Sequence, residues 1–125
     1  MISVSPKHRI YLAINPIDFR KGIHGIQKIC RNQFMQDPMS GHYFIFRNKS
    51  KTDIKLLYYD SQGFCLFQKR LSTGRFMHWP TATTSLITLT SAQLQVLIYN
   101  GDPQNTQDGV PWKPLIDTSG YPVSL

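Results

Sequence analysis

The sequence contains no glutamate, and its seven acidic residues are all aspartates. Metal-dependent nucleases and transposases hold their cations with clustered carboxylates. Asp53 and Asp60 lie at opposite ends of one predicted strand, roughly 20 Å apart by the rise per residue. Asp18 could approach Asp60 in space, but each also fits a helix cap or a turn. We therefore expect no metal site and no catalytic residues.

Other signatures of enzymes are also missing. The chain has neither of the common phosphate-binding loops, G-x-x-x-x-G-K-[ST] and G-x-G-x-x-G, and no G-x-S-x-G nucleophile motif. Its four histidines and two cysteines do not have the spacing of metal ligands. The sequence therefore favours a protein that is not an enzyme and binds no cofactor.

Long apolar runs and cysteine pairs are scarce as well. No run approaches the roughly 18 apolar residues that would span a bilayer, and residues 1–16 lack the pattern of a signal peptide. Cys30 and Cys65 each lie within an apolar pattern, as buried free thiols of a reducing compartment do. We expect a cytoplasmic protein with no membrane contact.

Positive charge, in contrast, is abundant. Fourteen Lys and Arg residues give a net charge of +7 and a pI near 9.7, and all of them except Lys113 lie in residues 1–80. A basic excess confined to one part of a chain is typical of a nucleic-acid contact. The alternative is a basic, soluble protein without such a partner.

The apolar pattern predicts one α+β domain over residues 1–100, with a small and mainly antiparallel sheet in β-α-β-β-β order followed by a short helix. The predicted strands are residues 9–14, 42–47, 54–59 and 64–70. A first helix is expected from an N-cap at Asp18 to about Phe34, and a second after the capping box that starts at Thr90.

Three regions of the chain leave questions open. The strands at 54–59 and 64–70 carry apolar residues on both faces, so the sheet has to be covered twice. Residues 72–80 fit either a short strand or an exposed loop. Residues 101–125 are rich in Pro and Gly and are expected to form an extended tail that packs on the domain or on a partner, or stays mobile.

Cations lie on one predicted face of the first helix and are interleaved with aromatic residues along the sheet. Such cations can neutralise phosphates, and the aromatic residues can stack on unpaired bases. The alternative is that the aromatic residues form the core and the cations solvate its rim. Trp79 and Trp112 are the candidate contacts to a protein partner. The candidate nucleic-acid-binding residues are Arg20, Lys21, Lys28, Arg31, Arg47, Lys49, Lys51, Lys69, Arg70 and Arg75.

Four stretches in this order carry a resemblance to a known family: DFRKG (18–22), DPMSGHYFIFRN (37–48), IKLLYYDSQGFCLFQKRLSTGRFMHWP (54–80) and LTSAQLQVLIYNGD (89–102). Over about residues 9–100 the chain resembles the TnpB-type accessory protein of the insertion-sequence-sixty-six family of bacterial transposable elements. That protein is distinct from the RNA-guided nucleases that share the TnpB name. The resemblance implies an accessory protein without catalytic residues, encoded beside a separate transposase and a small helix-turn-helix protein.

Two hypotheses for its function follow. In the first, the basic surface binds nucleic acid, most simply DNA at the ends of the element, to support transposition. In the second, the protein is an adaptor that holds the co-encoded transposase through the aromatic side of the sheet and does not touch nucleic acid. The sequence does not distinguish DNA from RNA, and the apolar strands also allow a homodimer.

Overall fold

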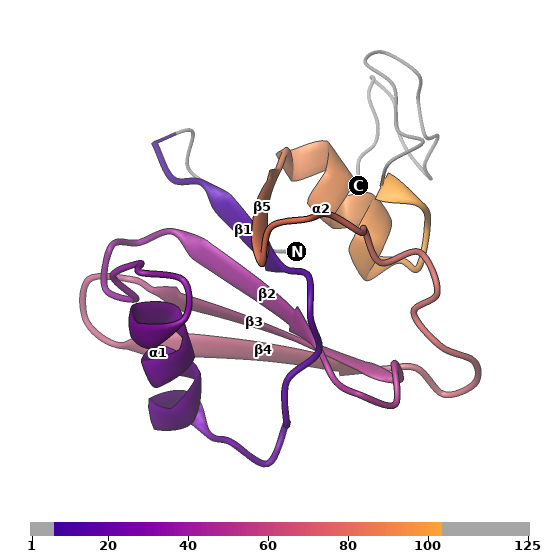
Figure 1. Cartoon of the computed structure of the whole chain (residues 1–125), viewed down its shortest axis with the longest axis horizontal. Helices are drawn as coiled ribbons and strands as arrows, with labels where there is room; N and C mark the ends of the chain where they lie inside the picture. Colours follow the sequence, from indigo (N-terminus) through magenta and orange to yellow (C-terminus); the bar gives the residue numbers. More distant parts are fainter. Residues whose placement is uncertain (1–6, 104–125) are drawn as a thin grey trace.

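The structure is a computed structural model that describes residues 7–103, which form a five-stranded sheet and two helices (Figure 1). The strands lie in the order β4-β3-β2-β1-β5. This arrangement confirms the predicted α+β class. The elements are β1 (Ile10–Ala13), α1 (Ile23–Asn32), β2 (Tyr43–Arg47), β3 (Asp53–Tyr59), β4 (Phe64–Arg70), β5 (Leu86–Leu89) and α2 (Ser91–Ile98).

The three middle segments form the expected antiparallel meander. Leu57 of β3 lies opposite Phe44 of β2 on one side and Leu66 of β4 on the other. β1 extends this meander by pairing parallel with β2, because α1 carries the chain back across the sheet between these two strands. β5 then pairs antiparallel with β1, which makes it the second edge of the sheet.

Both faces of the sheet are covered, as the apolar pattern requires. On one face, α1 packs Ile26 and Cys30 against Phe44 and Leu57. On the opposite face, α2 and the segment 76–79 fill a second cluster around Leu56. The domain therefore has two apolar layers with the sheet between them, and its edges and strand ends remain for contacts with other molecules.

The first helix begins later than the sequence predicts. It starts at Ile23, after Gly22, and no side chain caps it. Asp18 instead accepts hydrogen bonds from the backbone N–H of Arg20 at 2.9 Å and from the Arg20 guanidinium, because a short acidic side chain can satisfy nearby donors outside a helix. Arg20 and Lys21 therefore lie in the segment before α1, and the single basic helix face that was predicted does not form.

The second helix begins as predicted. The Thr90 hydroxyl accepts the Gln93 N–H at 3.1 Å, and the Gln93 side chain accepts the Thr90 N–H at 2.8 Å, which completes the capping box. α2 ends at Ile98, and the N–H of Gly101 donates to the carbonyl of Val96 at 2.7 Å.

Candidate nucleic-acid interface

The segment 71–80 is an irregular loop and not a strand, and it is only partly exposed because its two aromatic side chains are buried. Phe76 and Trp79 are 1% and 7% exposed and belong to the apolar cluster beneath α2. The indole Nε1 of Trp79 donates to the carbonyl of Ala13 at 2.8 Å. Trp79 therefore fills the core beside the short strand β1, and this burial leaves little of its ring for the predicted contact with a partner. Trp112 lies outside the described residues.

Arg47 is also engaged inside the protein. Its Nη1 donates to the carbonyl of Phe76 at 2.8 Å, and its guanidinium carbon lies 5.1 Å from the centre of the Trp79 ring. Burial lowers the pKa of this guanidinium from its ordinary value. Arg47 thus holds the segment 76–79 against the sheet, and its half-buried position makes it a poor contact for an external phosphate.

Lys69 has a similar internal role at the end of the second helix. Its Nζ donates to the carbonyl of Ile98 at 2.7 Å and lies 4.9 Å from the centre of the Tyr99 ring. A cation at this position satisfies a free carbonyl and the negative end of the helix dipole. Burial lowers the pKa of Lys69. We therefore remove Lys69 and Arg47 from the candidate phosphate contacts.

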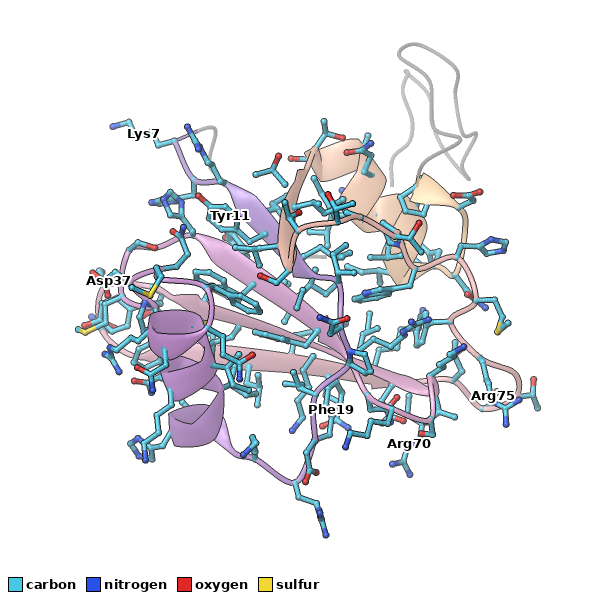
Figure 2. The ribbon with its side chains drawn as sticks, in the orientation of Figure 1. Lys7, Tyr11, Phe19, Asp37, Arg70 and Arg75 are labelled. Carbon is cyan, nitrogen blue, oxygen red and sulfur yellow. The ribbon has the colours of Figure 1, made fainter. Side chains whose placement is uncertain are left out.

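Four of the predicted cations do meet at one end of the sheet. Arg75 Nε donates to the carbonyl of Ser50 at 3.2 Å, which joins the segment after β4 to the loop between β2 and β3. The backbone N–H of Phe76 donates to the carbonyl of Lys51 at 2.7 Å and strengthens this junction. The side chains are exposed, and Figure 2 shows Arg70 and Arg75 on the same side of the molecule. We call the set the sheet-end cations: Lys49, Lys51, Arg70 and Arg75.

A buried carboxylate organises this end of the sheet. Asp53, fully buried at the start of β3, accepts hydrogen bonds from Arg70 Nε at 3.0 Å, from Gln68 Nε2 at 2.9 Å and from the Thr52 hydroxyl. Burial alone would raise the pKa of Asp53, but these donors outweigh it and lower the pKa, so the carboxylate stays charged. The Arg70 side chain remains 75% exposed.

The role of Asp53 is the part of the site that sequence reasoning missed. From the sequence, Asp53 was considered only as a possible metal ligand, although an aspartate directly before an apolar strand can signal a buried polar partner. That partner becomes identifiable once the strand register is known, because Asp53 and Arg70 lie directly opposite each other. Gln68, which also donates to Asp53, lies on the same face of the strand two residues earlier.

The remaining predicted cations lie apart from this end or at its border. Arg20, 92% exposed, forms an ion pair with Asp18 at 2.8 Å. Hydrogen bonds from Arg20 hold the pKa of Asp18 well below its ordinary range, and the charge of Lys49 adds a smaller contribution, so this pair lies near the sheet-end cations. Lys28 and Arg31 are exposed on α1, on the left in Figure 1, away from the loop that follows β2. Lys21 is exposed just before α1.

Within residues 7–103, no group of three or more His, Cys, Asp or Glu side chains is arranged to hold a metal ion. In that same range no helix has the length and apolar character needed to cross a membrane. The candidate functional site is therefore the group of sheet-end cations at one end of the sheet.

This chain belongs to the family described as IS66 Orf2 like protein, which matches residues 8–108. Membership confirms the resemblance found in the sequence and places the protein among transposition-associated accessory proteins. An uncharacterized protein of Sinorhizobium fredii, y4hO, is 34% identical over 106 residues, which are 85% of this chain and 90% of the relative. A second, y4jC of the same organism, is 34% identical over 86 residues, which are 69% of this chain and 74% of the relative. No solved structure matches the chain.

Proposed function

We propose that this accessory protein supports transposition without catalysis, by binding the phosphate backbone of DNA through the sheet-end cations in the bacterial cytoplasm. The observation that carries the proposal is that the loop after β2, the end of β4 and the segment after it are hydrogen-bonded to one another and each present exposed cations. Lys and Arg groups held in this way can neutralise several adjacent phosphates and release their counterions.

The burial of the nearby aromatic residues favours duplex DNA as the ligand. Proteins that bind single strands stack unpaired bases on exposed aromatic rings. Phe76 and Trp79, the aromatic residues nearest in sequence to Arg75, are buried and cannot offer their rings. The sheet-end cations therefore suit a phosphate backbone, and we expect a duplex to bind at least as well as a single strand of the same length.

A contact with the co-encoded transposase is the second candidate function, and one observation favours it. Met77 and Tyr99 are 63% and 51% exposed. The side chain of Asn100 donates to the carbonyl of Arg75 at 3.2 Å, which brings the end of α2 beside the segment that carries Met77. This small apolar surface adjoins the sheet-end cations, so one protein partner and DNA could be bound side by side.

The test of DNA binding is fluorescence anisotropy with a labelled duplex that carries the terminal repeats of the element, compared with a scrambled duplex over a salt series. The variant is Lys49→Glu with Lys51→Glu, since both side chains are exposed. We expect at least about a tenfold loss of affinity and a shallower salt dependence, by about 2 in the log–log slope, because two phosphate contacts are lost.

The matched control is Lys28→Glu with Arg31→Glu on α1, which lowers the net charge by the same amount on a separate surface. We expect this control to lose far less affinity than the sheet-end variant. Equal losses in the two variants would show that net charge alone attracts DNA and would contradict the proposed site. No binding of the wild-type protein at low salt would refute DNA binding and leave the transposase contact as the function to test.

A further inference from the structure

The strand β4 forms one edge of the sheet and leaves half of its backbone groups facing outward. Asp60 N–H donates to the carbonyl of Gly63, and Leu71 N–H donates to the carbonyl of Thr52, each at 3.0 Å. These two bonds show which residues of β4 are hydrogen-bonded to β3, because hydrogen-bonded and non-hydrogen-bonded positions alternate along an antiparallel pair. The backbone N–H and C=O groups of the odd-numbered residues of β4 are hydrogen-bonded to β3. The backbone groups that point outward belong to Phe64, Leu66, Gln68 and Arg70.

This edge has the features of a pairing surface. β4 pairs with β3 at seven consecutive positions, from Phe64 opposite Tyr59 to Arg70 opposite Asp53. The strand contains no proline, and its first four side chains are half-buried apolar groups. No other described strand pairs with its outer side. A long and regular edge whose first half is apolar is a template for a further strand, and proteins usually interrupt or cover such an edge.

The charges along β4 indicate which strand fits. Its C-terminal end carries Arg70, whose side chain is 75% exposed, whereas the turn before its N-terminal end carries the carboxylate of Asp60. Hydrogen bonds from the backbone of Gln62 and Gly63 lower the pKa of Asp60, so it is charged at neutral pH. A second β4 laid antiparallel brings each basic end toward the acidic turn of the other chain, whereas a parallel copy would place like charges together.

We infer that the protein forms a homodimer in which β4 pairs antiparallel with β4 of a second copy, centred on Phe67. This inference does not depend on the proposed DNA contact. With Phe67 at the two-fold axis, Phe64 lies opposite Arg70 of the second copy and Leu66 opposite Gln68, so all outward residues are used in about eight hydrogen bonds. The two sheets become one continuous sheet, and the half-buried apolar side chains gain cover from their symmetry mates.

A disulfide between two copies tests this register directly. At the two-fold axis, Phe67 faces itself as a non-hydrogen-bonded pair, whose Cα atoms lie about 4.5 Å apart, within the range of a disulfide. The variant is Phe67→Cys in a Cys65→Ser background. Burial raises the pKa of the remaining thiol, Cys30, to about 12, so it does not compete.

The matched control is Gln62→Cys in the same background, since Gln62 is exposed in the turn before β4 and would lie roughly 30 Å from its copy in this register. Mild oxidation of protein at a concentration above the micromolar dissociation range should convert most of the Phe67→Cys variant to a covalent dimer and little of the control. Failure of Phe67→Cys to cross-link, or equal cross-linking of both variants, would overturn the inference.

Sedimentation equilibrium of the full chain supplies a second measurement. The interface of two short strands is small, so we expect dimers that dissociate in the micromolar range. Leu66→Pro removes an outward N–H and no bond to β3, and proline is tolerated at the open side of an edge strand. We expect this variant, checked for folding by circular dichroism, to dimerise at least about tenfold more weakly. A wild-type protein that stays monomeric up to about 200 µM would refute the dimer, and an unfolded Leu66→Pro variant would leave the decision to the cross-linking pair.

Discussion

At the residue scale, the buried carboxylate of Asp53 is the group on which the candidate site depends most. It accepts side-chain hydrogen bonds from Arg70, Gln68, Thr52 and Asn48. Asp53→Asn keeps the shape but places an amide among these donors. We expect a loss of about 1–3 kcal/mol in the free energy of unfolding, measured with urea, because buried donors lose a charged acceptor. Asp37→Asn is the control, since Asp37 is an exposed turn residue that caps the N–H of Met39. A loss no larger than that of the control would contradict the role of Asp53.

The same residue carries the expected pH dependence. The folded-state pKa of Asp53 is lowered relative to an ordinary value near 3.9. Its contribution to stability is therefore complete above about pH 5 and is lost as the pH falls through 3.9 toward the lowered pKa. We expect the stability difference between wild type and Asp53→Asn to shrink over that range. A difference that stays constant down to pH 3 would show that the charge of Asp53 has no part in it.

Residue identity alone does not tell which cations are free. Lys49 and Lys69 are both lysines of the basic middle of the chain, yet Lys49 is exposed and Lys69 donates to the carbonyl of Ile98. The difference arises from a contact between residues 29 positions apart, which depends on how α2 packs across the sheet. Sequence reasoning therefore found the basic character of the sheet end but included two residues that serve the fold.

At the element scale, local patterns predicted most of the secondary structure. The β4 prediction agrees with the structure at both ends, because a short apolar run follows directly after the turn residues DSQG. The predicted start of α1 was wrong because two sequence signals compete before Ile23. Asp18 has the residue type of an N-cap, but its carboxylate is used by Arg20 two positions later, and Gly22 weakens helix formation before Ile23.

Lys69 provides a prediction about a whole element, the helix α2. Lys69→Met keeps the apolar stem but removes the donor to Ile98 and the positive charge near the end of the helix. We expect a loss of about 1 kcal/mol in unfolding free energy. DNA affinity should change less than threefold, in contrast to Lys49→Glu with Lys51→Glu. A tenfold loss of DNA affinity in a stably folded Lys69→Met variant would return this residue to the binding site.

At the scale of the whole molecule, the parts that sequence reasoning could not supply are contacts between distant segments. The need to cover both faces of the sheet followed from the strands at 54–59 and 64–70, but the identity of the second cover did not. That cover combines α2 with Phe76 and Trp79, which reach back to β1 at the other end of the chain. Pairing across 66 positions leaves no local periodicity, so an aromatic residue in a loop-like stretch was equally consistent with an exposed contact.

The two interpretations of Trp79, as a core residue and as an exposed contact to a partner, predict different effects of mutation. The Trp79 ring contacts the Arg47 guanidinium from β2, and its indole N–H binds the carbonyl of Ala13 in β1. Trp79→Phe removes this donor and leaves space in a close-packed cluster, so we expect a loss of about 2–4 kcal/mol in the free energy of unfolding. Met77→Ala, in the same segment but exposed, should change stability by less than about 0.5 kcal/mol. If Trp79 were instead a partner contact, Trp79→Phe would unfold like wild type and lose only binding. Urea unfolding of the two variants distinguishes a residue that joins the halves of the sheet from one that serves another molecule.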